Sequence, residues 1–242
     1  MKRALAFVLA LALTVLSFGV QASTFRPPSG FDAKMWDSTL ALYGTMGDTT
    51  HFLCTTEVIG RADDGAYILL SAGHCVQTIP AGVQFSVSDD IGSPRTDVSM
   101  LKAYMKADID MAIFALKTTK KYQVMELGDS TDLQIGEEVV NLNFALGLGK
   151  QLSHGTISSD ILQPSGACDD DCSGYFLIQA YGAGGSSGSA VISERTHKLI
   201  GLVIWRAPND NIGLGVEPIS KFATFMAEPN QPHPAPPDED DN

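Results

Sequence analysis

The sequence predicts an all-β fold, and three observations support this: many short β-rich segments, glycine-rich turns between them, and only one convincing helix. Asp63-Asp64-Gly65 is a typical hairpin turn, and it separates the first two segments. About 11 strands are expected in all, which is typical of a barrel or a sandwich. They lie at residues 54–61, 66–71, 83–88, 98–104, 111–116, 138–143, 152–158, 175–181, 190–193, 199–205 and 212–216.

The one convincing helix is expected near the C-terminus. Ser220 can cap this helix, and Phe222, Phe225 and Met226 supply one apolar face. Residues 31–45 are ambiguous, because their pattern suits either a short helix or a first strand.

The N-terminus has the features of a secretory signal peptide. Lys2 and Arg3 precede a mostly apolar run of 15 residues at 4–18, and small residues follow up to Ala22. A transmembrane anchor is the alternative, but the run is shorter than the roughly 20 apolar residues that a spanning helix needs. We therefore expect cleavage after Ala22 and export to the periplasm or outside the cell, with no membrane anchor left on the mature chain.

The mature chain is expected to be strongly acidic. The leader carries two positive charges, so its removal would change the net charge from −12 to −14. Such a charge repels phosphate backbones, and a nucleic-acid partner is therefore not expected. Residues 228–242 combine five prolines with a run of acidic side chains, which predicts a disordered tail. Residues 23–50 match no pattern that assigns them a role.

Four cysteines follow the leader, an even number that predicts two disulfides in an oxidising compartment. Three pairings are possible, and proximity along the chain favours Cys54–Cys75 and Cys168–Cys172. A metal site built from cysteine and histidine is the rival interpretation. Because the spacing around His74 and Cys75 matches no zinc pattern, we expect no metal.

Three segments carry residues suited to nucleophilic chemistry. His74 follows an apolar strand, where it could act as a general base and then as a general acid. Asp110, with Asp108 as its rival, opens an apolar strand from which it could orient a histidine. Residues 184–190 form a Gly-rich turn that could supply a serine nucleophile and oxyanion-stabilising N–H groups. Each segment alone also has a plain structural explanation, as a buried histidine, a turn aspartate or a flexible loop.

In chain order, these segments resemble the three sequence boxes of the chymotrypsin-like serine peptidases. Ser-Ala-Gly-His-Cys at 71–75 matches the family's histidine box, and Asp-Met-Ala-Ile at 110–113 matches its aspartate box. Gly-Ser-Ser-Gly-Ser-Ala at 185–190 matches its serine box. The resemblance selects Asp110 over Asp108, and it selects Ser187 over the neighbouring serines 186 and 189.

The resemblance also implies the architecture, which is two packed six-stranded antiparallel β-barrels with a short C-terminal helix. A peptidase domain is expected at 51–227, with its first barrel ending near residue 120 and its second beginning near 125. Residues 127–130, 135–139 and 155–158 are most similar to bacterial glutamyl endopeptidases and HtrA-type protease domains, here without a PDZ domain. The family pairs the cysteine after the catalytic histidine with one on the preceding strand, which further supports Cys54–Cys75.

The function that the resemblance implies is that of a serine endopeptidase working through an acyl-enzyme intermediate. His74, Asp110 and Ser187 would form the triad, and the N–H groups of Gly185 and Ser187 would form the oxyanion hole. The expected partners are polypeptide substrates, with a proteinaceous inhibitor as a further candidate, and no cofactor is needed. The alternative is a catalytically silent homologue that acts as an exported protein-binding module.

The resemblance also locates a pocket for the P1 residue, which is the substrate residue before the cleaved bond. Tyr181 stands where trypsin-like enzymes place an aspartate, so cleavage after Arg or Lys is not supported. Ile204 replaces the histidine of glutamyl endopeptidases, so cleavage after Glu is not supported either. A small or apolar P1 residue is expected, although Arg206 could instead favour an acidic group. The implied pocket residues are Tyr181, Gly182, Val203, Ile204 and Trp205.

Overall fold

The structure is a computed structural model. It describes residues 30–77, 79–106, 109–161, 174–206 and 213–230, with the backbone alone at 31–32 and 205–206. Several sequence predictions lie outside the described residues. They are the signal peptide at 1–22, the Cys168–Cys172 disulfide, the rival Asp108, the side chains of Trp205 and Arg206, and the tail at 231–242.

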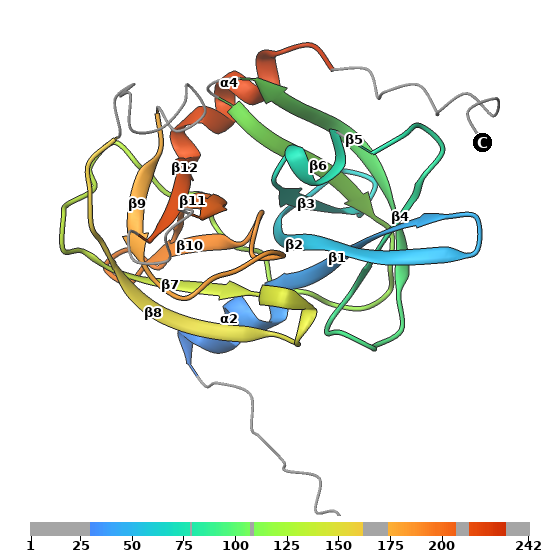
Figure 1. Cartoon of the computed structure of the whole chain (residues 1–242), viewed down its shortest axis with the longest axis horizontal. Coiled ribbons are helices and arrows are strands. Elements are labelled where there is room, and N and C mark those ends of the chain that lie inside the picture. Colours follow the sequence, from blue (N-terminus) through green and yellow to red (C-terminus); the bar gives the residue numbers. More distant parts are fainter. Residues whose placement is uncertain (1–29, 78, 107–108, 162–173, 207–212, 231–242) are drawn as a thin grey trace, which may run out of the picture.

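The first half of the chain forms a closed barrel of six antiparallel strands in the order β1-β2-β3-β6-β5-β4 (Figure 1). Alternation of buried and exposed side chains is weak in several strands, because side chains on both faces are buried. In β6, for example, seven of eight side chains are buried. The strands are β1 (Thr39–Met46), β2 (Thr49–Arg61), β3 (Tyr67–Ser71), β4 (Gln84–Ser88), β5 (Thr96–Lys106) and β6 (Ile109–Leu116).

The second half repeats this arrangement with strand order β7-β8-β9-β12-β11-β10, again closed and antiparallel (Figure 1). The predicted fold of two six-stranded barrels with a short C-terminal helix is therefore confirmed. The strands are β7 (Glu138–Asn143), β8 (Gln151–Ile157), β9 (Phe176–Gln179), β10 (Ala190–Ser193), β11 (Leu199–Arg206) and β12 (Leu214–Pro218).

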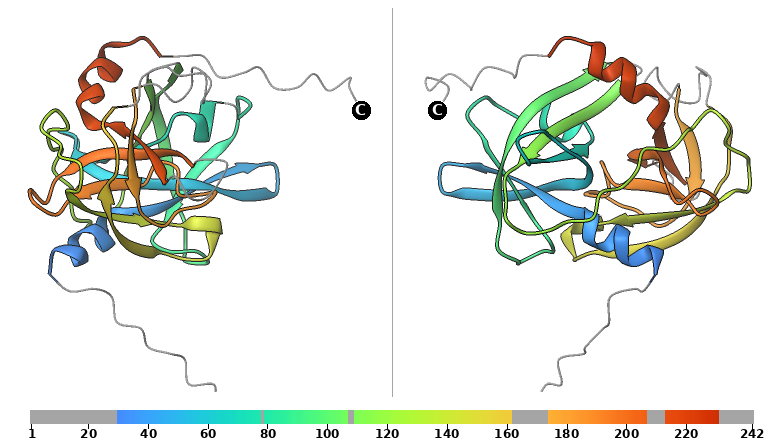
Figure 2. Two further views of the ribbon diagram at one scale, coloured as in Figure 1. Left: turned by 60° about the vertical axis from the view of Figure 1, so that its left-hand side comes forward. Right: turned by 180° about the vertical axis from the view of Figure 1, so that it is seen from behind.

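The ambiguous segment at 31–45 contains both of the elements that its pattern allowed. Helix α2 (Phe31–Ser38) runs directly into β1, which pairs with β2 and β4 and so closes the first barrel. The helix lies on the outside of the molecule beside the start of β1 and β8 (Figure 2). Lys150, just before β8, donates to the Trp36 carbonyl at 2.6 Å, so α2 contacts both barrels. Part of the segment that the sequence left without a role is thus a component of the first barrel.

The two barrels share a hydrophobic core. The main buried cluster fills the first barrel and includes Val140, Leu142, Ala190 and Leu202 from strands of the second. Packing of this kind fixes the barrels against each other, because apolar area buried between them stabilises the docked arrangement. Residues placed along the shared face are therefore held by both halves of the chain.

The C-terminal helix α4 (Phe222–Ala227) returns the chain from the second barrel to the first (Figure 2). Its Phe225 is fully buried, and Lys102 of β5 lies 5.0 Å from that ring and donates to the carbonyls of Met226 and Glu228. The prediction that Ser220 caps this helix is wrong. Ser220 lies inside a preceding 3₁₀ turn (η3, Ile219–Lys221), and the residue before α4 makes no side-chain cap. Among the described residues, no helix is long and apolar enough to cross a membrane.

Candidate active site

His74 lies where strand β3 passes into a single helical turn, α3 (His74–Gln77). Its ring Nδ1 is 2.5 Å from Asp110 Oδ2, and its backbone N–H donates to Asp110 Oδ1 at 2.6 Å. Both carboxylate oxygens therefore hold the same residue. A proton on Nδ1 satisfies this contact and leaves Nε2 as the basic nitrogen of the ring.

Asp110 is the second residue of β6 and is only 5% exposed. Its backbone N–H donates to both carboxylate oxygens of Glu217, at 3.1 and 3.0 Å. Glu217 comes from β12 of the second barrel and is fully buried. The site thus joins an acid of one barrel to the main chain of the other, an arrangement that sequence reasoning missed. A lone acid within an otherwise apolar strand was the available signal for it.

Ser187 lies in the turn that leads into β10, and the structure separates it from the serines on either side. Ser186 is 1% exposed, and its hydroxyl accepts the Ala183 N–H at 3.0 Å. Ser189 is fully buried and accepts from Asn141 at 2.9 Å. Ser187 is half-buried, and among the described residues its hydroxyl makes only a long contact of 3.4 Å to the Ile204 carbonyl. The surroundings therefore leave Ser187 as the serine best placed to react.

The turn around Ser187 presses against the strand end that carries His74. A side chain at Gly188 would place its Cβ 2.3 Å from Ser71 Oγ and 2.8 Å from the Ala72 nitrogen. Gly188 has a φ of +80°, in the region that favours glycine. No hydrogen bond joins His74 to Ser187 in the described part of the chain. Catalytic hydrogen bonds are often long before substrate binds, so this geometry is compatible with a triad.

The backbone of the turn can donate to an oxyanion. Gly185 adopts a φ of +93°, which reverses the chain two residues before Ser187. Within the described residues, the N–H groups of Gly185 and Ser187 donate to no acceptor. Two free donors in one tight turn are the arrangement that stabilises the negative oxygen of an acyl-transfer intermediate.

The described residues of the implied P1 pocket lie in different surroundings. Tyr181 is 53% exposed, whereas Val203 is buried in the core of the second barrel. Gly182 lies against Leu214, since a Cβ there would be 2.9 Å from both of its methyl groups. Ile204 reaches the site through its carbonyl, which faces Ser187. The pocket assignment therefore stays a prediction, and Val203 acts in the core rather than on an open surface.

The cysteines beside the site form a disulfide between Cys54 and Cys75. Their sulfur atoms and a ring nitrogen of His74 lie within 4.8 Å of one another, which is close enough to suggest a metal centre. A cysteine binds a metal as its thiolate, however, and the sulfur atoms of a disulfide are not thiolates. These three residues therefore do not suit a metal.

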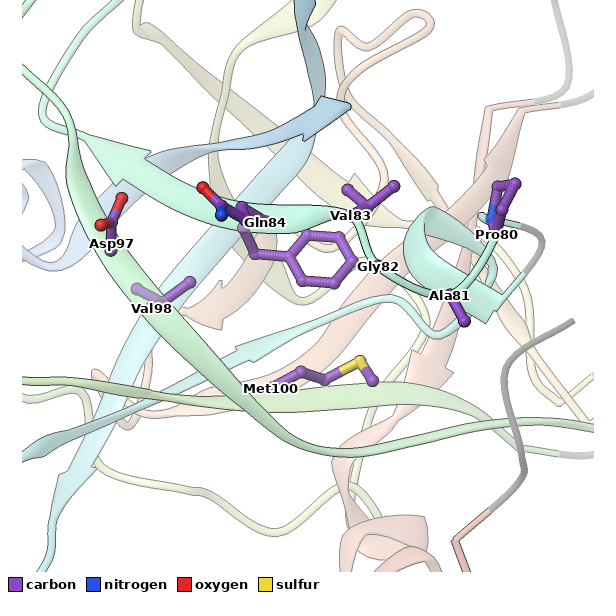
Figure 3. Close-up of a pocket in the computed structure, with 9 residues that line it drawn as sticks. Pro80, Ala81, Gly82, Val83, Gln84, Asp97, Val98 and Met100 are labelled. Carbon is purple, nitrogen blue, oxygen red and sulfur yellow. The ribbon is translucent and has the colours of Figure 1, made fainter. Parts of the chain in front are cut away.

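A separate pocket of about 410 Å³ lies on the first barrel beyond α3 (Figure 3). Pro80 and Ala81 form one end of it, and Gln84 and Asp97 form the other, with Met100 beneath. None of the candidate catalytic residues lines this pocket. It is therefore distinct from the site around His74.

Comparison with known families identifies the chain. Residues 54–202 match the model of the trypsin-like peptidase domain. The chain belongs to the trypsin-like peptidase family. The matched range includes all three residues of the candidate triad, while β1, β12 and α4 lie outside it and complete this trypsin-like peptidase.

Solved structures show the same fold at low sequence identity. The HtrA-type protease AlgW, in a complex with a tripeptide, aligns with a TM-score of 0.64 and 18% identity, over 83% of this chain and 63% of AlgW. Rv3671c from M. tuberculosis H37Rv, in an inactive form, aligns with a TM-score of 0.61 and 19% identity, over 83% and 90%. Deg5 aligns with a TM-score of 0.61 and 16% identity, over 80% and 89%. The chain thus spans about three fifths of the length of AlgW. No curated protein matches it.

Proposed function

We propose that this trypsin-like peptidase is an exported serine endopeptidase, which hydrolyses peptide bonds through Ser187, His74 and Asp110. The observation that carries the proposal is the double hydrogen bond from His74 to Asp110, at 2.5 and 2.6 Å, beside a turn with free N–H donors. Ser187 is the half-buried serine of that turn, whereas its serine neighbours are buried and hydrogen-bonded.

The reaction would begin with attack of Ser187 Oγ on the carbonyl carbon of the substrate. Nε2 of His74 would take the hydroxyl proton, while Asp110 holds the ring and stabilises the imidazolium. The negative oxygen of the tetrahedral intermediate would accept hydrogen bonds from the N–H groups of Gly185 and Ser187. His74 would then protonate the leaving amine. In the second half of the reaction, His74 would take a proton from water as the water attacks the acyl-enzyme, and it would return that proton to Ser187 Oγ as the bond to the acyl group breaks.

The substrates would be polypeptides, and the side chains present can carry this chemistry without a cofactor. We propose a small or apolar P1 residue, because Tyr181 and Ile204 offer no charge for a basic or acidic one. The disulfide beside the site suits export to an oxidising compartment.

The direct test is labelling with a fluorophosphonate probe, followed by mass spectrometry of the modified peptide. We expect labelling at Ser187 and loss of turnover by about 10⁴- to 10⁶-fold in Ser187→Ala. Ser189→Ala is the matched control, because that buried serine lies in the same segment, and it should still be labelled at Ser187. A folded wild-type protein that takes no label would overturn the proposal and favour a protein-binding role.

The P1 preference can be read from the same preparation. A mixed peptide library digested by the wild type, with the product ends sequenced by mass spectrometry, should show small or apolar residues before the cleaved bonds. Dominant cleavage after Arg or Lys would contradict the proposed pocket.

A further inference from the structure

Thr55 connects the first barrel to the turn that carries Ser187. It follows Cys54 on β2, is fully buried, and uses every polar atom it has. Its N–H donates to the Ser187 carbonyl at 3.0 Å, and its hydroxyl donates to the Gly185 carbonyl at 2.8 Å. The hydroxyl also accepts the Phe144 N–H at 3.1 Å, and its carbonyl accepts from Ser71 at 2.7 Å.

Hydrogen bonds to a carbonyl fix the direction of the N–H on the same peptide. A trans peptide is planar, with its C=O and N–H pointing in opposite directions. The N–H of Leu146 holds the Gly184 carbonyl at 2.6 Å, so the N–H of Gly185 points the opposite way. The Thr55 hydroxyl holds the next carbonyl, that of Gly185, so two successive peptide planes are fixed from outside the turn.

Packing confines Gly185 but not Gly184. A Cβ on Gly185 would lie 2.5 Å from a ring carbon of Phe52 and 2.9 Å from the Phe144 carbonyl oxygen. Gly184 is exposed, and a Cβ built on it would meet nothing within 4 Å. A glycine in open surroundings, such as Gly184, can rotate between several backbone conformations at little cost. The Leu146 hydrogen bond therefore sets the orientation in which the Gly185 N–H is free. The Thr55 hydroxyl fixes the following peptide plane, between Gly185 and Ser186, so the two bonds together hold the backbone on both sides of Gly185.

We propose that Thr55 is a positioning residue for the oxyanion hole, acting through the carbonyls of Gly185 and Ser187. This inference rests on the proposed peptidase function. Because Thr55 is fully buried, it does not touch substrate. Its hydroxyl keeps the turn in the form that binds the transition state, so its loss should lower the rate of acylation and leave substrate binding nearly unchanged.

The adjacent Thr56 offers a matched control for the test. Neighbouring side chains of a strand point to opposite faces. Thr56 is also fully buried, but its hydroxyl donates to the Leu70 carbonyl at 3.0 Å, within the first barrel. Replacing either threonine by valine removes one buried hydroxyl at nearly constant volume, and only one of the two bonds the catalytic turn.

The experiment compares Thr55→Val, Thr55→Ser and Thr56→Val in kcat, KM and thermal midpoint, with each preparation normalised by fluorophosphonate titration. We expect Thr55→Val to lower kcat by about 10- to 100-fold, somewhat less than loss of an oxyanion donor itself, with KM within about threefold of wild type. Thr55→Ser keeps the hydroxyl and should recover kcat to within a few-fold. Thr55→Val and Thr56→Val should lower the thermal midpoint by similar amounts, but Thr56→Val should retain wild-type kcat.

A second readout separates positioning from general destabilisation. A peptide boronate binds as a tetrahedral anion, so its affinity should fall in Thr55→Val by about the same factor as kcat/KM. Wild-type kcat in Thr55→Val, or an equal loss in Thr56→Val, would overturn the inference. If Thr55→Val does not fold, Thr55→Ser and Thr55→Ala provide the same contrast, and equal rates in that pair would overturn it. An inactive, unlabelled wild type would instead refute the peptidase function itself.

Discussion

Glu217 accepts the backbone N–H of Asp110 with both of its carboxylate oxygens, at 3.1 and 3.0 Å. The two residues come from different barrels, and both are buried. The half-buried Lys221 lies 3.9 Å from one oxygen of Glu217 and partly offsets its charge. Across the interface between the barrels, one acid thus holds the strand from which the other acid contacts His74.

Removal of the Glu217 carboxylate should destabilise the protein and lower its catalytic rate. In Glu217→Ala, the buried N–H of Asp110 loses its partner and a cavity opens, so we expect the free energy of unfolding to fall by roughly 3 kcal/mol. We also expect kcat to fall at least tenfold as Asp110 shifts. Glu217→Gln keeps an acceptor of the same shape and should lose less than about 1 kcal/mol. Urea unfolding and steady-state kinetics measure both, and equal losses in the two variants would argue against a role for this hydrogen bond.

Gly188 should tolerate no side chain, because of contact as well as backbone conformation. A Cβ there would be 2.3 Å from the Thr55 carbonyl oxygen of β2 and from Ser71 Oγ of β3, and would push the turn away from both strands. Gly65 is the matched control, since its φ of +85° is similar and its surroundings are open. We expect Gly65→Ala to cost about 1 kcal/mol. Gly188→Ala should cost about 3 kcal/mol and lower turnover by about 100-fold.

The measurements for this pair are urea unfolding and peptide hydrolysis. Because both variants carry similar backbone strain, the difference in their stability measures the effect of the close contact at Gly188. Equal stability and full activity in the two would show that the turn can move away from β3 without consequence.

The disulfide between Cys54 and Cys75 spans 21 residues and joins the neighbours of Thr55 and His74. Removing it should lower the free energy of unfolding by about 3 kcal/mol, because the unfolded chain gains the entropy of an open loop. The double variant Cys54→Ala, Cys75→Ala tests this more cleanly than a reductant, which would also reduce the disulfide that the sequence predicts between Cys168 and Cys172. Urea unfolding of the double variant should give a midpoint well below that of wild type, and an unchanged midpoint would contradict the expectation.

Stability should fall as the pH rises from about 4.5 to 7, because of Glu57. Burial raises the pKa of this fully buried carboxyl to about 7, and hydrogen bonds from Ser38 and Thr39 and the charge of Lys150 only partly oppose the rise. Each hydroxyl has one proton but lies near two acceptors, the Met35 carbonyl and Glu57. A protonated Glu57 supplies one of the two donors that these contacts lack.

The sign follows from proton uptake. Between pH 4.5 and 7 the folded protein holds a proton at Glu57 that the unfolded chain has lost, so stability is present at the acid end and lost as pH rises through the folded pKa. The loss is on the order of 3 kcal/mol. Glu57→Gln should flatten the stability–pH profile in this window, whereas Glu126→Gln at an exposed site should not. A profile in Glu57→Gln as steep as that of wild type would refute this account.

Local pattern was sufficient for much of the fold. The strands around His74 and Asp110 follow from runs of apolar residues between turn signals, and Asp63-Asp64-Gly65 does form the turn between β2 and β3. The helix cap was wrong because a 3₁₀ turn at Ser220 continues into α4, so the helix begins without a free cap position. The segment before β2 stayed ambiguous because α2 and β1 are both short, and β1 is stabilised by pairing with distant β4.

The sequence by itself determined the barrel strands after β1, the motif frames and the candidate triad of His74, Asp110 and Ser187, because these depend on the order of residues along the chain. Only the tertiary structure decided which groups support them. Thr55 is hydrogen-bonded to the Ser187 turn, and Glu217 to Asp110, and in each case the partners are more than a hundred residues apart in the sequence. Hydrogen bonds of this kind depend on how two barrels dock, and docking is set by the shared core, so no local pattern of residues encodes them.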